Sequence, residues 1–303
     1  MDAWYRLARS VSRGLPSSWA WSCADRAADL RWLSWAAGRQ GVQANLGMVL
    51  GSAVSERSAP VREVFRNFAR YLLELLDLSR AVERATLRVE GDASLATVKA
   101  QGGGAILVTA HVGNWELLAA VAARRLGLSV SAVALPHPEE GVDRFFNAQR
   151  QRQGIELIPL GPQAGQESLR ALRRGRALGV LGDRPFGEPG VWVRAFGRLI
   201  RLPRGPALMS LRSRAPMVPM FLIREARTRF RVVMDAPIWP GPEAGDQAVL
   251  TLVQSYAESL ERLVRRAPTQ WLLFDAVDAK PLPRLRVGGA PAAEAPHAVG
   301  STG

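Results

Sequence analysis

The sequence of 303 residues contains one cysteine and three histidines, and this shortage excludes several kinds of site. With Cys23 alone, the chain forms neither an intramolecular disulfide nor a cysteine-based zinc site, which fits a reducing compartment. Zinc sites draw their ligands from His, Cys, Asp and Glu at short spacings. The sequence has no cluster of that kind, so we expect no metal.

Long apolar runs are also missing. No uncharged stretch approaches the roughly 18 residues that a membrane-spanning helix needs. The N-terminus lacks the basic region, apolar stretch and cleavage site of a secretory signal peptide. We therefore expect neither an ordinary spanning helix nor a signal peptide.

Lysine is scarce, occurring only as Lys99 and Lys280, yet the net charge is +13 and the pI is near 11.3. Almost all the positive charge is therefore arginine, whose forked guanidinium suits phosphate. Such a surface favours nucleic acid, anionic lipid headgroups or phosphorylated ligands. A GC-rich genome would explain the lack of lysine but not the excess charge. Because the arginines are spread over many segments and no nucleic-acid motif is recognised, nucleic-acid binding is the secondary hypothesis.

Apolar residues alternate between strand and helix spacing along most of the chain. The run 105–110 is short and continuously apolar, which is typical of a buried parallel strand. Strands that alternate with helices predict an α/β fold with a largely parallel sheet. The predicted strands are 87–91, 105–110, 128–136, 155–160, 177–183, 216–225 and 230–238, with a hairpin or extended segment at 192–203. The predicted helices are 61–78, 94–103, 116–127, 142–154, 167–175, 205–215 and 246–268.

The chain divides into three parts. Residues 1–40 are predicted as two amphipathic helices broken at Pro16, the second ending at Gly38, and they hold five of the nine tryptophans. Tryptophan and arginine on such helices are typical of an interfacial membrane anchor, although a helical hairpin packed on the core explains the pattern equally well. Residues 41–283 form the main domain. Residues 284–303 are rich in Gly, Ala and Pro without periodicity, so we expect a disordered tail.

The motif HVGNWE, residues 111–116, joins a predicted strand to a predicted helix. Ligands bind at the carboxyl ends of strands in open α/β sheets, which is where His111 lies. We expect Glu116 to reach back to the imidazole, fix its tautomer and make it a general base. A serine nucleophile in a G-x-S-x-G motif is absent. The base would therefore activate a hydroxyl of the substrate.

Ordered blocks around this motif resemble one family from about residue 40 to residue 275. These blocks are FRNFARYLLELL, GGGAILVTAHVGNWELLA, VDRFFNAQRQRQGIELIPLG, LGDRPFG, FGRLIRLPRGPALMSLRSRAPMVPMFLIRE and TQWLLF. The sequence resembles the bacterial lipid A late acyltransferases (lauroyl and myristoyl transferases) and their relatives, including phosphatidylinositol mannoside acyltransferases. HVGNWE matches the H-x4-E form of the motif of this lysophospholipid acyltransferase-like superfamily.

The resemblance implies a glycerolipid acyltransferase-like fold, with a mixed, largely parallel sheet flanked by helices. It implies transfer of a fatty acyl chain from a thioester, of acyl carrier protein or coenzyme A, to a hydroxyl of a membrane glycolipid or lipid A-type acceptor. No cofactor is expected beyond that donor. The alternatives are a catalytically inactive lipid-binding relative and a hydrolase that uses water as the acceptor.

The resemblance also assigns residues. His111 is the catalytic base and Glu116 its acidic partner. The oxyanion needs hydrogen-bond donors, which we expect from backbone N–H groups near Gly113 and Asn114 or from an arginine, although Asn114 could simply cap the turn. The other candidates are Arg150 with Arg152 as the competing choice, Asp183 and Arg184 at the same sheet edge as His111, and Arg201 and Arg204 as phosphate or headgroup ligands ahead of a helix.

The location of the enzyme is predicted from a feature in which this sequence differs from the family. Lipid A acyltransferases commonly carry an N-terminal spanning helix, whereas this sequence has only the Trp- and Arg-rich helices. We therefore expect a peripheral enzyme on the cytoplasmic face of the bacterial inner membrane. Its partners would be the acyl carrier protein or coenzyme A thioester, an anionic membrane surface and the lipid acceptor, without nucleic acid. The C-terminal block WLLFDAVDA also departs from the family, and its effect stays open.

Overall fold

The computed structural model describes residues 9–10, 13–100, 102, 104–186, 189–242 and 244–282. Its centre is a seven-stranded sheet in the order β1-β9-β8-β2-β5-β3-β4. Strands β8 and β9 pair antiparallel, and the other neighbouring pairs are parallel, so the predicted α/β fold with a mixed, largely parallel sheet is confirmed. The strands are β1 (Thr86–Glu90), β2 (Ala105–Thr109), β3 (Val130–Ala134), β4 (Glu156–Pro159), β5 (Ala177–Leu181), β8 (Met217–Arg224) and β9 (Arg229–Met234).

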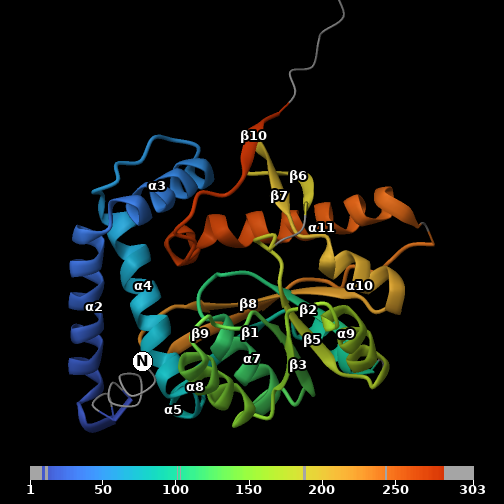
Figure 1. Cartoon of the computed structure of the whole chain (residues 1–303), viewed down its shortest axis with the longest axis horizontal. Helices are drawn as coiled ribbons and strands as arrows, with labels where there is room; N and C mark the ends of the chain where they lie inside the picture. The colour runs from blue at the N-terminus through green and yellow to red at the C-terminus, as the bar shows by residue number, and fades with distance from the viewer. Residues whose placement is uncertain are drawn as a thin grey trace, which may run out of the picture.

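Helices cover both faces of this sheet, and α2, α3 and α4 stand beside it (Figure 1). They are α2 (Ser17–Ser34), α3 (Ala36–Leu50), α4 (Ala59–Leu76), α5 (Leu78–Arg84), α6 (Asp92–Ala100), α7 (Trp115–Arg124), α8 (Glu140–Gln151), α9 (Ala164–Arg173), α10 (Gly205–Ser213), α11 (Gly245–Arg266) and the 3-10 helix η1 (Pro268–Gln270).

Strand β2 shows how the two faces are built. Its side chains alternate between the faces. Ile106 and Val108 join the core under α10 and α11, whereas Ala105 and Leu107 join the core under α5 and α7. All four are buried, which explains why the run is continuously apolar. Figure 1 shows α11 on one side of the sheet and α7 on the other.

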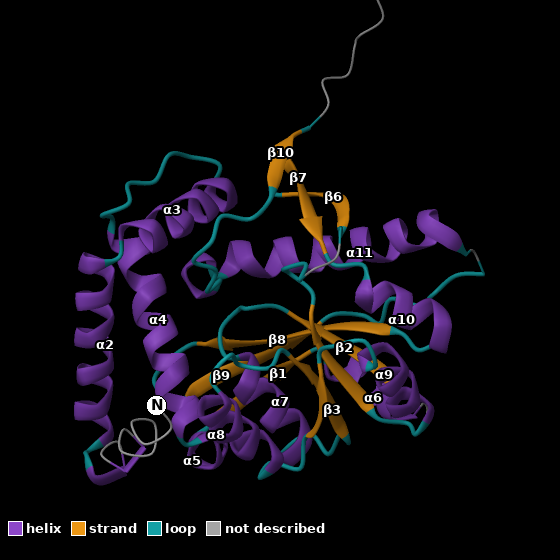
Figure 2. Ribbon diagram, in the orientation of Figure 1, coloured by secondary structure: helices purple, strands orange, loops and turns teal. Residues whose placement is uncertain are grey.

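A small sheet stands apart from the main one. Strands β6 (Val191–Ala195) and β7 (Arg198–Leu202) form an antiparallel hairpin, which is one of the two alternatives predicted for 192–203, and β10 (Ala279–Pro281) pairs with β7. Figure 2 shows this sheet beyond α11, away from the main sheet. Strand β10 was not predicted, because a three-residue exposed strand has no apolar pattern in the sequence.

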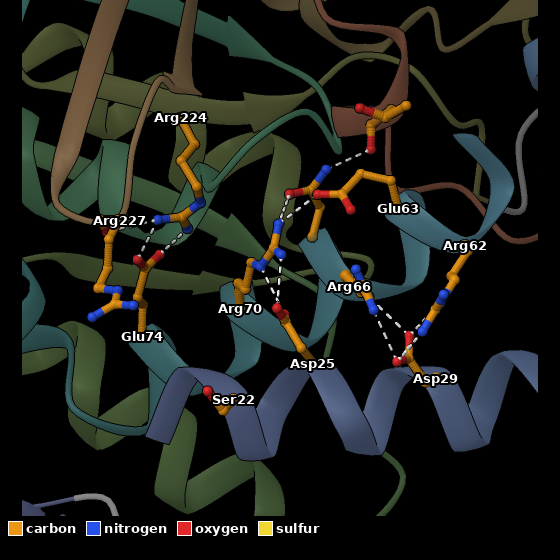
Figure 3. Close-up of polar contacts among 12 residues, drawn as sticks. Ser22, Asp25, Asp29, Arg62, Glu63, Arg66, Arg70, Glu74, Arg224 and Arg227 are labelled. Atoms are coloured by element: carbon orange, nitrogen blue, oxygen red, sulfur yellow. Dashed lines mark hydrogen bonds and ion pairs between the residues drawn. The ribbon is translucent and has the colours of Figure 1, made fainter. Parts of the chain in front are cut away.

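The N-terminal helix α2 is fastened to α4 by ion pairs (Figure 3). Asp29 accepts hydrogen bonds from Arg62 and Arg66, and Asp25 accepts two from Arg70. The hydrogen bonds from Arg62 and Arg66 outweigh burial and lower the pKa of the Asp29 carboxyl below its usual range. The side of α2 that faces the protein is therefore polar as well as apolar.

The opposite side of α2 carries exposed apolar side chains, with exposed Arg26 among them. Trp19, Leu30 and Leu33 are 66%, 69% and 56% exposed. At about 100° per residue they lie within about 60° of one another around the helix. Among the residues that the structure describes, no helix has both the length and the apolar character needed to cross a bilayer. Two alternatives were predicted for this region, packing on the core and an interfacial surface. The side chains suited to each lie on different sides of α2.

Most predicted helix ends are shifted by a few residues, and two helices differ from the prediction in where the chain breaks. The second N-terminal helix does not end at Gly38, because the chain breaks at Trp35 and α3 runs on through Gly38 and Gly41. A Cβ on Gly41 would lie 1.8 Å from the carbonyl oxygen of Phe274, so this glycine serves close packing and does not stop the helix. The helix predicted over 61–78 ends at Leu76, and α5 follows as a separate helix. The predicted tail at 284–303 lies outside the described residues.

Candidate active site

Two neighbouring parallel strands bring His111 and Asp183 together. Strands β2 and β5 are in register with Thr109 opposite Leu181, and each polar residue follows its strand by two positions. The N–H of Gly182 donates to the carbonyl oxygen of Thr109 at 2.8 Å and carries the pairing past the strand ends. Equal offsets from paired strand ends place the two side chains side by side at the carboxyl edge of the sheet.

The imidazole of His111 is held by the carboxylate of Asp183. Nδ1 lies 2.9 Å from Oδ1, while the backbone N–H of His111 and the indole N–H of Trp271 donate to Oδ2 at 2.9 and 3.0 Å. The Asp183 side chain is 0% exposed. Burial would raise its pKa, but the interaction with His111 and the hydrogen bonds from His111 and Trp271 lower it overall. With Nδ1 donating to Asp183, Nε2 is the nitrogen left to accept a proton.

The turn after His111 depends on Gly113. Its φ is +61°, and a Cβ there would lie 1.8 Å from the carbonyl oxygen of Leu222. The N–H of Gly113 donates to Gln270 at 2.8 Å, and the N–H of Asn114 donates to Leu222 at 3.3 Å. The turn is therefore clamped between β8 and η1, and only glycine fits there.

Asn114 holds the start of α7. Its side-chain oxygen accepts from the N–H of Leu117 at 2.9 Å, and its amide donates to Glu74 on α4 at 2.6 Å. Glu74 also accepts two hydrogen bonds from Arg224 at the end of β8. Asn114 is fully buried. It is thus an N-cap that ties α7 to α4 and β8.

Glu116 is paired with Arg150 on α8. The guanidinium donates Nε–H and Nη2–H to the two carboxylate oxygens at 2.8 and 2.6 Å, and its other arm reaches Asn147. Burial would lower the pKa of Arg150, but the charge and hydrogen bonds of Glu116 raise it. Burial, with a smaller contribution from Glu116, also raises the pKa of nearby Tyr71. This bidentate pair joins α7 to α8.

An aromatic wall stands beside the imidazole. The ring of Trp115 stacks on Tyr71 with centroids 4.1 Å apart and meets His111 edge-on at 4.9 Å. Trp115 therefore limits the positions that the His111 ring can take, and Tyr71 supports Trp115 from α4.

A cavity of about 220 Å³ adjoins the loop that carries Asp183. Two arginines line it, and each has a carboxylate partner across it: Arg184 pairs with Asp275, and Arg201 pairs with Asp278. Arg204 is not in the lining of this cavity and pairs with Asp246, which is 90% exposed. The predicted phosphate ligands therefore hold acidic partners in this state.

The sequence model of the family described as "Bacterial lipid A biosynthesis acyltransferase" matches residues 5–276. The chain belongs to this family. It is therefore an acyltransferase, and the sheet edge with His111 is its candidate active site.

Curated relatives of this acyltransferase carry a more specific name. The phosphatidylinositol mannoside acyltransferase of Mycobacterium tuberculosis is 27% identical over 247 residues, 77% of this chain and 75% of that protein. The enzyme of the same name from Mycolicibacterium smegmatis is 24% identical over 242 residues, 77% of each chain. The crystal structure of the 1-acyl-sn-glycerophosphate acyltransferase of Thermotoga maritima matches with a TM-score of 0.40 and 13% identity, covering 67% of this chain and 87% of that one.

Three predicted contacts of the acyltransferase site need correction. The carboxylate that holds the imidazole is Asp183, whereas both oxygens of Glu116 are occupied by Arg150. The backbone N–H groups of Gly113 and Asn114 are bonded within the fold, so they do not form the predicted oxyanion site in this state. These N–H groups are already occupied because the turn is held between β8 and η1, whose carbonyl oxygens accept their hydrogen bonds. The prediction that Asp183 lies at the same sheet edge as His111 is confirmed.

Sequence reasoning missed three supporting residues of the acyltransferase site. Trp271 lies in the matched block TQWLLF, but nothing in that block shows that its indole donates to Asp183. Glu74 and Tyr71 lie on a helix far from the motif in sequence, and only the packing of α4 against α7 brings them near. Equal spacing of His111 and Asp183 from their strands was the signal that could have paired them.

Proposed function

We propose that this acyltransferase moves a fatty acyl chain from a thioester of acyl carrier protein or coenzyme A to a hydroxyl of a membrane glycolipid, with His111 as general base. The observation that carries the proposal is the contact of 2.9 Å between His111 Nδ1 and Asp183 at the carboxyl edge of β2 and β5. A buried carboxylate on one imidazole nitrogen raises the basicity of the other.

The reaction then needs three events at His111. Nε2 removes the proton of the acceptor hydroxyl while the oxygen attacks the thioester carbonyl carbon. The tetrahedral intermediate collapses, the carbon–sulfur bond breaks, and the thiolate takes the proton from the imidazolium. Asp183 stabilises the imidazolium formed between these steps, and Trp271 keeps the carboxylate aimed at Nδ1.

The oxyanion of that intermediate needs a donor. The predicted alternatives were the backbone N–H groups at Gly113 and Asn114 or an arginine. Because the two N–H groups are bonded within the turn, we propose Arg184. It follows Asp183 directly, lines the cavity beside it, and pairs with Asp275 on the exposed side. Exchange of that exposed carboxylate for substrate costs little, since surface ion pairs contribute about 0–1 kcal/mol.

The acceptor is proposed to be a phosphorylated glycolipid. The relatives are named for phosphatidylinositol mannoside, which carries both a phosphate and sugar hydroxyls. Arg201 and Arg204 remain proposed headgroup ligands. Their partners Asp278 and Asp246 lie at the surface, so a phosphate can replace them.

We further propose that the acyltransferase works on an anionic membrane surface such as the cytoplasmic face of the bacterial inner membrane. The exposed apolar side of α2, with Trp19, Leu30 and Leu33, is suited to the boundary between headgroups and acyl chains. The net charge of +13 favours anionic lipids. A lipid acceptor has to be reached at such a surface.

Product analysis by mass spectrometry tests the reaction. Wild type, His111→Ala and the matched control His137→Ala are incubated with labelled acyl thioesters of several chain lengths and a lipid extract. His137 is exposed in a loop, so its loss should leave transfer unchanged. We expect a new acylated lipid from wild type and the control but not from His111→Ala. Near wild-type transfer by His111→Ala would refute the mechanism, and release of free fatty acid alone would indicate a hydrolase.

Vesicle flotation tests the membrane surface. Deletion of α2 would strip α4 of its ion-pair partners, so point changes are cleaner. Trp19→Ser with Leu30→Ser should reduce recovery on anionic vesicles. The control, Trp239→Ser with Leu282→Ser, also removes one exposed tryptophan and one exposed leucine, but not from α2. Equal recovery of both double variants would refute the role of α2.

A further inference from the structure

A second arginine-lined cavity lies outside the active site, between the start of α2, the α4–α5 junction and the β8–β9 turn. Its volume is about 90 Å³. That is several times the roughly 10–15 Å³ that one water requires, and it is large enough for a phosphoryl group. Its lining includes three arginines from two segments: Arg80 and Arg84 on α5, and Arg227 in the turn.

The acids of this cavity are already neutralised by other arginines. Glu74 accepts two hydrogen bonds from Arg224 at 2.6 Å each. Asp77 accepts from Arg13 at 2.6 and 3.0 Å and from Arg9 at 3.4 Å. Burial alone would raise the pKa of Asp77, but the hydrogen bonds and charges of these arginines lower it. Both carboxylates are therefore occupied by other arginines, and the first turn of α2 adds no acid.

The three lining arginines have no such partner among the residues that the structure describes. Among the described residues, no ion pair joins Arg80, Arg84 or Arg227 to a carboxylate. Like charges gathered around one small space repel one another. A bound anion would remove this repulsion.

Trp21 gives the cavity a fixed wall. Its ring lies 5.5 Å from the Arg227 guanidinium, and Arg224 and Arg70 approach the same ring at 5.0 and 5.1 Å. Figure 3 shows Arg224, Arg227 and Glu74 together beside α4. These contacts hold Arg227 at the cavity without using its hydrogen-bond donors, because a ring face attracts the cation through its π electrons.

We propose that this cavity is a phosphate-binding site, formed by Arg80, Arg84 and Arg227 around the wall of Trp21. Guanidinium groups bind phosphate oxygens through paired N–H donors, which matches three unpaired arginines at one small cavity. The phosphoryl group can belong to an anionic lipid headgroup or to a soluble phosphorylated compound. The site does not depend on the reaction proposed for His111.

Titration calorimetry of the full chain with inorganic phosphate tests the site. The variant is Arg80→Gln, Arg84→Gln and Arg227→Gln together. The matched control, Arg170→Gln, Arg173→Gln and Arg212→Gln, removes the same charge from exposed arginines of α9 and α10. We expect affinity for phosphate to fall at least about tenfold in the variant, since hydrogen bonds between charged groups are the stronger kind. The control should bind as wild type does.

Two results would overturn the proposal. Wild type could fail to bind phosphate in a saturable way, or both triple variants could weaken equally, which would show an effect of net charge alone. Circular dichroism of both variants checks the fold. The three lining arginines form no ion pair with a described carboxylate, so the fold should survive their replacement.

A vesicle assay separates the two sources of the phosphoryl group. Phosphatidylcholine vesicles are compared with and without phosphatidylglycerol. If the source is a headgroup, binding that depends on phosphatidylglycerol should fall in the variant and be competed by inorganic phosphate. If the source is a soluble compound, the variant loses phosphate binding while its vesicle binding equals that of wild type. Either result supports the site, given loss of phosphate binding in the variant alone.

Discussion

Two buried carboxylates near the HVGNWE motif differ in what donates to them. Asp183 accepts from an imidazole, a backbone N–H and an indole, none of which is a permanent cation. Glu116 accepts from the guanidinium of Arg150, which is always charged. One carboxylate therefore keeps an uncompensated charge for His111, while the charge of the other is cancelled.

This difference assigns the two carboxylates different roles: Asp183 has the proposed catalytic role, and Glu116 has a structural one. In the mechanism proposed above, the negative charge of Asp183 favours the imidazolium form of His111. The charge of Glu116 is paired with Arg150, and this ion pair joins α7 to α8. It thereby holds α7, the helix that begins directly after the turn at Gly113. An acidic residue at the end of the motif thus acts on His111 through the backbone and packing, not through the ring.

Asp183→Asn should give the largest effect. An amide has one acceptor oxygen for three donors, and its own N–H₂ would oppose one of them, so the imidazole loses its orientation and tautomer. We expect the rate of acyl transfer to fall about 10³–10⁴-fold, as in catalytic triads. The measurement is kcat with acyl thioester and lipid acceptor, with circular dichroism to confirm folding. The control is Asp92→Asn, which changes an exposed carboxylate at the start of α6 and should stay close to wild type.

A fall in kcat of less than about tenfold in Asp183→Asn would contradict the contrast drawn between Asp183 and Glu116. Loss of one charge-assisted hydrogen bond already corresponds to a larger fall than that. Such a small fall would show that His111 does not use this carboxylate.

Glu116→Gln should act on stability. It leaves the buried Arg150 guanidinium without its counter-charge, which costs about 3 kcal/mol of unfolding free energy. The control is Glu140→Gln, which breaks the exposed pair with Arg144 and should cost about 0.5 kcal/mol or less. Urea unfolding measures both. Adding Arg150→Gln should recover part of the loss, since it removes the unpaired charge.

The same Glu116→Gln protein should transfer acyl groups within about tenfold of wild type where it is folded, because Asp183 still holds the ring. A loss of activity as large as that of Asp183→Asn, with unchanged stability, would instead make Glu116 the partner of His111 during the reaction.

Trp271→Phe tests the support of Asp183. It removes one indole donor while keeping an aromatic ring against Phe196, with which Trp271 stacks at 5.4 Å. Loss of one hydrogen bond to a charged group corresponds to about 1.5 kcal/mol, or about a tenfold fall in kcat. KM should change little. Unchanged kcat would show that two donors hold the carboxylate well enough.

The centre of the fold could be predicted from the sequence because central strands such as β2 and β5 are almost continuously apolar. Residues such as Ile106 and Leu107 face opposite cores and are both buried, so the run is unmistakable. The prediction that a helix ends at Gly38 was wrong, because glycine inside a helix can also serve close packing against another segment. At Gly41 the approach of the Phe274 carbonyl requires glycine inside α3.

The site could be predicted only in part. The motif located His111, and the strand ends located Asp183 at the same edge. The choice between Asp183 and Glu116 as ring partner depends on Arg150, which lies on another helix and captures Glu116. The spacing of His111 and Glu116 in the sequence therefore does not show whether they pair, because Arg150 decides it.

The pH dependence of stability gives the smallest effect and the finest test of the comparison. The pKa of Asp183 is lowered in the folded protein, so its contribution is present above the unfolded value of about 3.8 and is lost as pH falls through the folded value. At neutral pH, Asp183→Asn should lower the unfolding free energy by about 1 kcal/mol, because neutral hydrogen bonds replace charge-assisted ones. That difference from wild type should shrink below about pH 4 as the wild-type carboxyl becomes protonated. Urea unfolding from neutral to acidic pH measures it. A difference that instead grows toward acid would mean that the folded protein already holds Asp183 protonated, and the imidazolium would then lack the charge assigned to stabilise it.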